Sequence, residues 1–205
     1  MQYTSNKVIS RIYGHGKGWV FSQKDLADCG TAMAVNKSLL RLRQKGTIRL
    51  LFRGIYEYPR FSKLLGETAS PAPQKIAYAV ARKFGWSIYP SGETALNLLG
   101  LSNQVPAKHI YFSDGPSKKY TWNKSEMIFK KRAIKETSVL SAQTALVVQA
   151  LKALGKENVG DDVITFLKTK LSAKGKSTAL REARYVTSWV YDIIKKVAKP
   201  EVANG

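Results

Sequence analysis

The chain has 205 residues, 44% of them hydrophobic, and a formal net charge of +20 with a sequence pI of about 10.0. A chain of this length can fold as one large or two small domains without metal or disulfide staples, and its charge favours polyanionic partners such as DNA or RNA. No run approaches the ~20 apolar residues of a membrane-spanning helix, and the N-terminus lacks the apolar segment of a secretory signal, so we expect a cytoplasmic protein without a membrane partner.

The first predicted element is an amphipathic segment over residues 4–13, in which Val8 and Ile12 point inward. A glycine-rich stretch at 14–18 ends this segment. It lacks the GxxxxGK[ST] spacing of a phosphate-binding loop, so we interpret it as a flexible connection. A short strand at 19–21 follows.

Two helices are predicted next along the chain. Ser22 is a good N-cap residue, and Asp25 favours the same helix start electrostatically. This first helix must be short because residues 29–30 break it. Thr31 can cap a second helix, and Gly46 is suited to end that helix.

The second helix has an apolar stripe, because Val35, Leu39 and Leu42 fall at i, i+4 and i+7. This stripe is expected to pack inward. At about 100° per residue, the opposite side carries Met33, Lys37, Leu40, Arg41 and Gln44. Lys37 and Arg41 therefore lie on the face that points away from the core.

Two strands, residues 47–51 and 55–58, are predicted after the helices. Helix, turn, helix and hairpin in this order predict a winged helix-turn-helix, which is a common DNA-reading device. Arg49 and Arg53 lie on the hairpin, where phosphate contacts fall in this fold. Residues 1–60 carry a net charge of +8, which favours DNA binding over the alternative, a protein-binding module.

Beyond residue 60 the sequence predicts a linker at 61–73 and a second domain over 74–205. The predicted strands of this domain are 86–89, 109–112, 118–122 and 127–131, which make a small antiparallel sheet. Its predicted helices are 74–84, 93–99, 141–154, 161–171 and about 178–197. The expected fold class is therefore α+β, with a winged helix-turn-helix at 1–60, a mixed α+β second domain and a helical C-terminus.

A second basic segment lies at 118–135, where seven cations stand against Glu126. Tyr120 and Trp122 interleave with lysines there, as aromatic rings do on surfaces that bind RNA or single strands. The alternative is a meander with both rings packed inward and the lysines solvated. The candidate cations of this second nucleic-acid surface are Lys118, Lys119, Lys130, Lys131 and Arg132.

The sequence favours no catalytic or metal site. Asp161 and Asp162 begin a predicted helix, where negative charge is favourable without any catalytic role. His15 and His109 fall in different predicted domains and lack the Cys/His spacing of a zinc site. Cys29 is the single cysteine, which excludes an internal disulfide and suits a reducing cytoplasm. We expect a protein that is not an enzyme and that uses no cofactor.

Three stretches together resemble a known family. RGIYEYPR at 53–60, PSGETALNLLGLSNQVPAKHIYFSDG at 90–115 and the predicted winged helix before them are similar to the AbiEi-like antitoxins of type IV toxin–antitoxin systems. The resemblance covers about residues 4–135, and GETALNLLGLSNQVP is its most specific part. The helices after residue 140 match only loosely.

The resemblance implies a two-domain antitoxin. Its N-terminal domain would bind inverted repeats in its own promoter DNA and repress the operon. Its C-terminal domain would counter a nucleotidyltransferase-like toxin without forming a stable complex. An RNA-binding protein and a DNA-binding regulator without a toxin stay open as alternatives.

The resemblance also supplies candidate DNA contacts. The matching positions are Ser22, Gln23, Lys24, Asn36, Lys37, Arg41, Arg49 and Arg53. Arginine can read guanine and asparagine can read adenine, each through two hydrogen bonds. Which of these residues meet bases and which meet phosphates is left open by the sequence.

Overall fold

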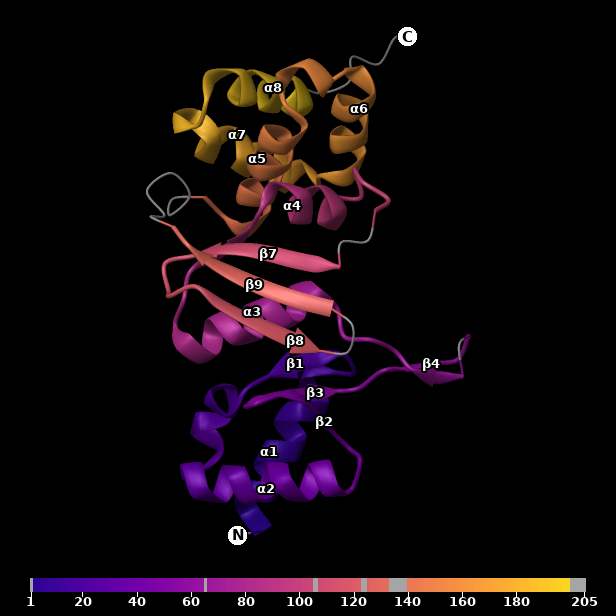
Figure 1. Ribbon diagram of the computed structural model, residues 1–205, viewed down its shortest axis with the longest axis vertical. Coiled ribbons are helices and arrows are strands. Elements are labelled where there is room, and N and C mark those ends of the chain that lie inside the picture. Colours follow the sequence, from indigo (N-terminus) through magenta and orange to yellow (C-terminus); the bar gives the residue numbers. More distant parts are fainter. Residues whose placement is uncertain (1, 65, 105–106, 123–124, 133–139, 200–205) are drawn as a thin grey trace. The chain divides into compact units, whose positions relative to one another are not determined.

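The computed structural model describes residues 2–64, 66–104, 107–122, 125–132 and 140–199 (Figure 1). Helices and small antiparallel sheets both occur, so the fold class is α+β, as the sequence predicts. The chain divides into two compact units, Met1–Trp86 with Lys119–Met127 and Ser87–Lys118 with Ile128–Gly205. Over the described residues, no helix combines the length and the apolar character that crossing a membrane requires.

The first unit begins with three helical segments, α1 (Gln2–His15), the short helix η1 (Gln23–Cys29) and α2 (Ala32–Gln44). In Figure 1, α1 and α2 lie on the same side of strands β1 to β3. The segments enclose a hydrophobic core of buried residues, which includes Val8, Ile12, Phe21, Leu26, Val35, Leu39, Leu42 and Ile48. The predicted apolar stripe of the second helix therefore packs inward.

A three-stranded antiparallel sheet follows these helices in the same unit. β1 (Trp19–Phe21) pairs with β3 (Ile55–Tyr58), which pairs with β2 (Arg49–Phe52), giving the order β1-β3-β2. The β2–β3 turn passes through Gly54, whose φ of +77° lies in the left-handed region that glycine adopts without strain. These strands match the predicted ones, except that β2 starts two residues later and ends one residue later than expected.

Asp25 fixes the start of η1. Its Oδ2 accepts hydrogen bonds from the Ser22 backbone N–H at 2.8 Å and from the Ser22 hydroxyl at 3.1 Å. Ser22 and Asp25 together form a capping box, in which the side chain of each residue bonds to the backbone N–H of the other. Backbone geometry leaves the helical region at Leu26 (φ −120°, ψ 15°), and η1 is short, as predicted.

The helix α3 (Pro73–Phe84) also belongs to the first unit. Lys75 Nζ donates a hydrogen bond to the Gly18 carbonyl at 3.0 Å. Arg82 Nε forms an ion pair with Asp25 Oδ1 at 2.6 Å. These contacts tie α3 to the segments on either side of β1.

The predicted domain boundary at 61–73 therefore differs from the observed division, which falls after Trp86. The stretch predicted as a linker contains a two-stranded hairpin, β4 (Phe61–Ser62) and β5 (Glu67–Thr68). Pro73 begins α3 at its first position, where a proline fits without the loss of a helical hydrogen bond. The sequence does not reveal, however, that α3 bonds back to the N-terminal elements.

Strands of a second sheet follow α3. They are β6 (Ile88–Pro90), β7 (Lys108–Ser113), β8 (Lys118–Trp122) and β9 (Ser125–Lys131), in the order β6-β7-β9-β8. Between β6 and β7 lies α4 (Gly92–Leu99), and the Thr94 hydroxyl accepts a hydrogen bond from the Ile110 N–H at 3.0 Å. The strands predicted from the sequence are present, with ends shifted by at most two residues.

Helices form the rest of the second unit. They are α5 (Ala142–Leu154), η2 (Lys156–Asn158), α6 (Asp161–Lys170), α7 (Ala173–Glu182), η3 (Ala183–Tyr185) and α8 (Ser188–Ala198). Figure 1 shows them clustered together in orange to yellow. Leu151, Leu167 and Val190 are fully buried in their shared core.

The single helix predicted for about 178–197 is wrong, because α7 and α8 are separate helices. Val186 (φ −80°, ψ 174°) and Thr187 (φ −48°, ψ 131°) leave the helical region between them. Both residues are β-branched, which lowers their helix propensity. Ser172 caps α7, its hydroxyl accepting a hydrogen bond from the Gly175 N–H at 3.1 Å.

Candidate nucleic-acid interface

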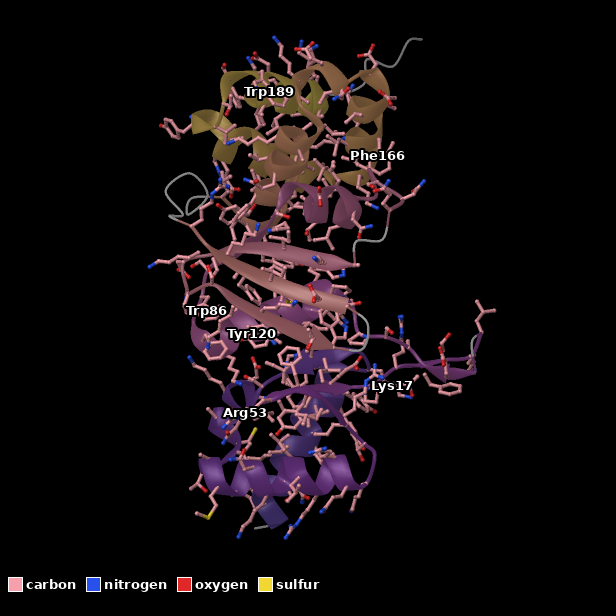
Figure 2. All side chains as sticks on the ribbon, in the orientation of Figure 1. Lys17, Arg53, Trp86, Tyr120, Phe166 and Trp189 are labelled. Atoms are coloured by element: carbon pink, nitrogen blue, oxygen red, sulfur yellow. The ribbon has the colours of Figure 1, made fainter. Side chains whose placement is uncertain are left out.

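The outer face of α2 presents an exposed row of donor side chains. Lys37 and Arg41 are exposed on it, and Asn36, Arg43 and Lys45 are exposed on the flanks of the same helix. Figure 2 shows side chains projecting along the side of α2 that faces away from the sheet. The helix contains no Asp or Glu, so no carboxylate of α2 itself neutralises these cations.

The start of α2 is anchored by side-chain hydrogen bonds. The Thr31 hydroxyl accepts from the Ala34 N–H at 3.3 Å, as the sequence predicts for an N-cap. Ser38 donates to the Ala34 carbonyl at 2.9 Å, and its hydroxyl lies 3.0 Å from that of Ser5 on α1. These bonds fix α2 against α1 and therefore fix the direction in which its outer face points.

A hollow lies between α1 and α2, beside the outer face. Its volume is about 220 Å³, and its lining includes Ser5, Thr31, Met33, Lys37, Ser38 and Arg41. Lys37 and Arg41 thus stand at its edge, one helical turn apart. The arrangement offers two cations and an apolar surface to the same ligand.

The three candidate contacts at the start of η1 differ in accessibility. Ser22 is only 1% exposed and bonds to Asp25, so its observed role is structural. Gln23 is half-buried, and its Nε2 donates to the Ala32 carbonyl at 2.9 Å. Lys24 is exposed and remains accessible to a ligand.

The β2–β3 hairpin carries Arg53 at its exposed turn, where Figure 2 labels it. The Arg53 backbone carbonyl accepts a hydrogen bond from Lys83 Nζ of α3 at 3.0 Å. One residue earlier, the Phe52 ring stacks on Tyr120 with 4.9 Å between centroids. The hairpin is therefore held from two sides while the Arg53 side chain faces solvent.

Arg49 has a structural role that its sequence position did not reveal. Its Nε forms an ion pair with Glu57 Oε2 at 2.5 Å, and its guanidinium donates to the Ala69 carbonyl at 2.6 Å. The Glu57 side chain is only 2% exposed, so Arg49 compensates a buried charge. Its predicted phosphate contact stays a prediction.

The second candidate surface has exposed cations but packed rings. Lys118, Lys119, Lys130, Lys131 and Arg132 are exposed. Of the seven cations in 118–135, Lys124 and Lys135 lie outside the described residues. Lys119 pairs with Glu126, and the Arg132 guanidinium lies 4.4 Å from the Phe112 ring centroid.

The aromatic residues of this segment are not free to stack on bases. Trp122 is 5% exposed, and Tyr120 is half-buried against Phe52. This arrangement agrees with the alternative given above, a meander with inward rings and solvated lysines.

A family model matches residues 7–180 and is described as a family of unknown function, DUF6088. The chain belongs to this family. No curated protein matches it. Among solved structures, the crystal structure of RV2827C protein from Mycobacterium tuberculosis is similar, with 14% identity over 97% of this chain and 76% of that chain, at a TM-score of 0.42. The family match begins in α1 and ends in α7, so it includes residues of both compact units.

Two buried titratable groups of this member of the DUF6088 family have shifted pKa values. Burial raises the pKa of the Cys29 thiol, which makes it a poor nucleophile. Burial also lowers the pKa of His109. Within the part of the chain that the structure describes, no three His, Cys, Asp or Glu residues gather as metal ligands would.

Proposed function

We propose that this chain is a sequence-specific DNA-binding protein whose first unit contains a winged helix-turn-helix. In this proposal α2 enters the major groove and the β2–β3 turn approaches the backbone or the minor groove. One observation carries it: α2 buries an apolar stripe, lacks carboxylates, and exposes Lys37 and Arg41 on the opposite face, with Asn36 exposed at the flank of that face.

The chemistry of these side chains supports reading of base edges. Arg41 offers a planar fork of donors that suits the O6 and N7 atoms of guanine, and Asn36 offers the amide pair that suits adenine. Lys37 and Arg41 are one turn apart, so both reach the same groove. Arg53, exposed at the turn, suits a phosphate contact that positions the protein without reading sequence.

We further propose, from the resemblance of residues 4–135 to AbiEi-like antitoxins, that the DNA is the chain's own promoter. The chain would then act as antitoxin and autorepressor, countering a nucleotidyltransferase-like toxin without a stable complex. The second unit would carry the antitoxic activity. RNA binding at 118–135 receives less support, because Trp122 is buried and Tyr120 packs against Phe52.

The DNA-binding proposal is tested with the full-length chain, its promoter fragment and an unrelated fragment of equal length. Wild type should bind the promoter fragment more tightly. Lys37→Ala should weaken this binding by about ten-fold, the effect of losing ~1.4 kcal/mol. Lys63→Ala removes the same charge from an exposed position on another segment and should keep the preference. Equal binding of wild type to both fragments would contradict the proposal.

The antitoxin proposal needs a different readout. A nucleotidyltransferase-like gene beside this one should arrest growth when expressed alone, and co-expression of this chain should restore growth. A variant with Lys37→Ala and Arg41→Ala should still restore growth while failing to repress a promoter reporter. Loss of both activities in a soluble double variant contradicts the proposed division of labour.

A further inference from the structure

The outer face of α2 carries two exposed apolar side chains among its polar ones. Met33 is 70% exposed and Leu40 is 53% exposed. They are seven positions apart in the sequence, so they lie about 10 Å apart along the helix axis and on nearly the same side of the helix. Lys37 stands between them, and Arg41 follows Leu40 directly.

A single exposed leucine is ordinary on a protein surface, but this pattern is more specific. Two large apolar groups alternate with cations on one face of a helix that has no carboxylate. A ligand complementary to this face must offer negative charge and small apolar groups together. The major groove of duplex DNA does so, because phosphates line its edges and each thymine presents a C5-methyl group.

We propose that Met33 and Leu40 contact thymine C5-methyl groups in the major groove. The inference rests on the proposed function, because it requires α2 to lie in that groove. Their separation of about 10 Å exceeds the 3.4 Å rise of one base pair, so the two side chains contact different base pairs. Met33 and Leu40 then select A·T pairs beside the pairs that Asn36 and Arg41 read.

The test uses a duplex that the full-length chain enriches from a random pool. This duplex is resynthesised with deoxyuridine replacing one thymidine at a time, which removes only the C5-methyl group. At two positions the replacement should weaken binding by about four-fold, the effect of exposing one buried methyl. Other positions should change little.

The variants assign each methyl to a side chain. Leu40→Ala should become insensitive to deoxyuridine at one of the two positions, and Met33→Ala at the other. Leu64→Ala is the matched control, because Leu64 is 94% exposed on another segment, and it should keep both sensitivities. Both positions on α2 are exposed, so the variants are expected to fold, and circular dichroism verifies this.

Two results overturn this inference but leave the proposed function standing. One is an enriched duplex that binds equally with thymine and uracil, and the other is a sensitivity to deoxyuridine that persists in the Met33→Ala/Leu40→Ala double variant. If Leu40→Ala instead converts a dimer to a monomer and no deoxyuridine effect exists, the apolar pair is a protein interface and the inference is also wrong. Failure to enrich any duplex contradicts the proposed function itself, so the two failures are distinguishable.

Discussion

At the scale of single residues, the two arginines of the β2–β3 hairpin have different environments. Arg49 pairs with the buried Glu57, whereas Arg53 is exposed at the turn. Arg49→Ala leaves a buried carboxylate without its partner. Because Arg49 is itself about one-third exposed, solvent screens part of this loss, and we expect the free energy of unfolding to fall by about 2 kcal/mol.

Urea denaturation of the full-length chain measures this effect. Arg53→Ala is the matched control and should change the free energy of unfolding by less than about 0.5 kcal/mol. Adding Glu57→Gln to Arg49→Ala should recover part of the loss, because the buried side chain is then neutral. Equal stability of the Arg49→Ala and Arg53→Ala variants would show that the ion pair is unimportant.

The buried His109 makes the free energy of unfolding depend on pH. Burial lowers its pKa from the ordinary value of 6.5, so the unfolded chain binds a proton more readily than the folded chain does. The stability that neutral His109 provides is present above pH 6.5 and is lost as the pH falls from there through the lowered pKa.

The free energy of unfolding should therefore decrease between pH 7 and pH 5, and His109→Gln should flatten that slope. Carboxylates with lowered pKa values, such as Asp28 and Asp192, lose their contribution to the free energy of unfolding only below the pH range in which His109 titrates. A slope that is unchanged in His109→Gln assigns the titration to another group.

At the scale of elements, Asp25 connects the start of η1 to α3. One carboxylate oxygen accepts from Ser22 and the other pairs with Arg82. Asp25→Ala removes both connections and should lower the free energy of unfolding by about 2 kcal/mol. Arg82→Ala keeps the Ser22 bonds but removes the ion pair and the hydrogen bond from Arg82 to the Val20 carbonyl, and it should cost about half as much, since Arg82 is 45% exposed.

Thermal unfolding followed by circular dichroism compares these variants with Lys24→Ala, which removes an exposed charge from the same segment. Lys24→Ala should unfold like wild type. If Arg82→Ala is as destabilising as Asp25→Ala, the Ser22 bonds contribute no more than the hydrogen bond from Arg82 to the Val20 carbonyl.

The elements also show which features a sequence reveals. Periodicity located α2, because the Val35, Leu39 and Leu42 stripe is local and its inward packing decides the helix orientation. Alternation of apolar and polar residues and the turn residues between them located the strands, because these signals are also local in the sequence. The break before α8 was missed, because the apolar pattern continues across Val186 and Thr187 while the backbone does not remain helical.

The candidate site was predictable only in part. Exposure of Lys37 and Arg41 follows from helix geometry, and the structure agrees with it. The partners of Arg49 and Arg82 lie on other elements, up to 62 residues away, so no local pattern indicates them. Likewise, a pattern of lysines and aromatic rings at 118–122 cannot show that Tyr120 stacks on Phe52.

At the scale of the whole molecule, the first compact unit is larger than the segment predicted to be a domain. α3 contributes Ile76 and Val80, both fully buried, and three of its cations bond to the N-terminal elements. A fragment of residues 1–60 lacks these contacts. It should unfold at a temperature lower by more than about 10 °C than a fragment of residues 1–86, because several kcal/mol of apolar burial are lost.

Circular dichroism of the two fragments under the same buffer conditions checks this expectation. Equal midpoints would mean that α3 adds little to the first unit. That result would favour the boundary at 61–73 which the sequence predicted.

The central claim is that α2 reads sequence while the hairpin turn anchors to the backbone. The most direct test measures binding of wild type, Arg41→Ala and Arg53→Ala to an enriched duplex and to its scrambled version over a series of salt concentrations.

Arg41→Ala should reduce the preference for the enriched duplex by about one to two decades, the discrimination of a bidentate base contact. Arg53→Ala should weaken binding to both duplexes alike and lower the salt slope by about 0.9. An unchanged preference in Arg41→Ala would contradict the account, because α2 would then not be the reading helix.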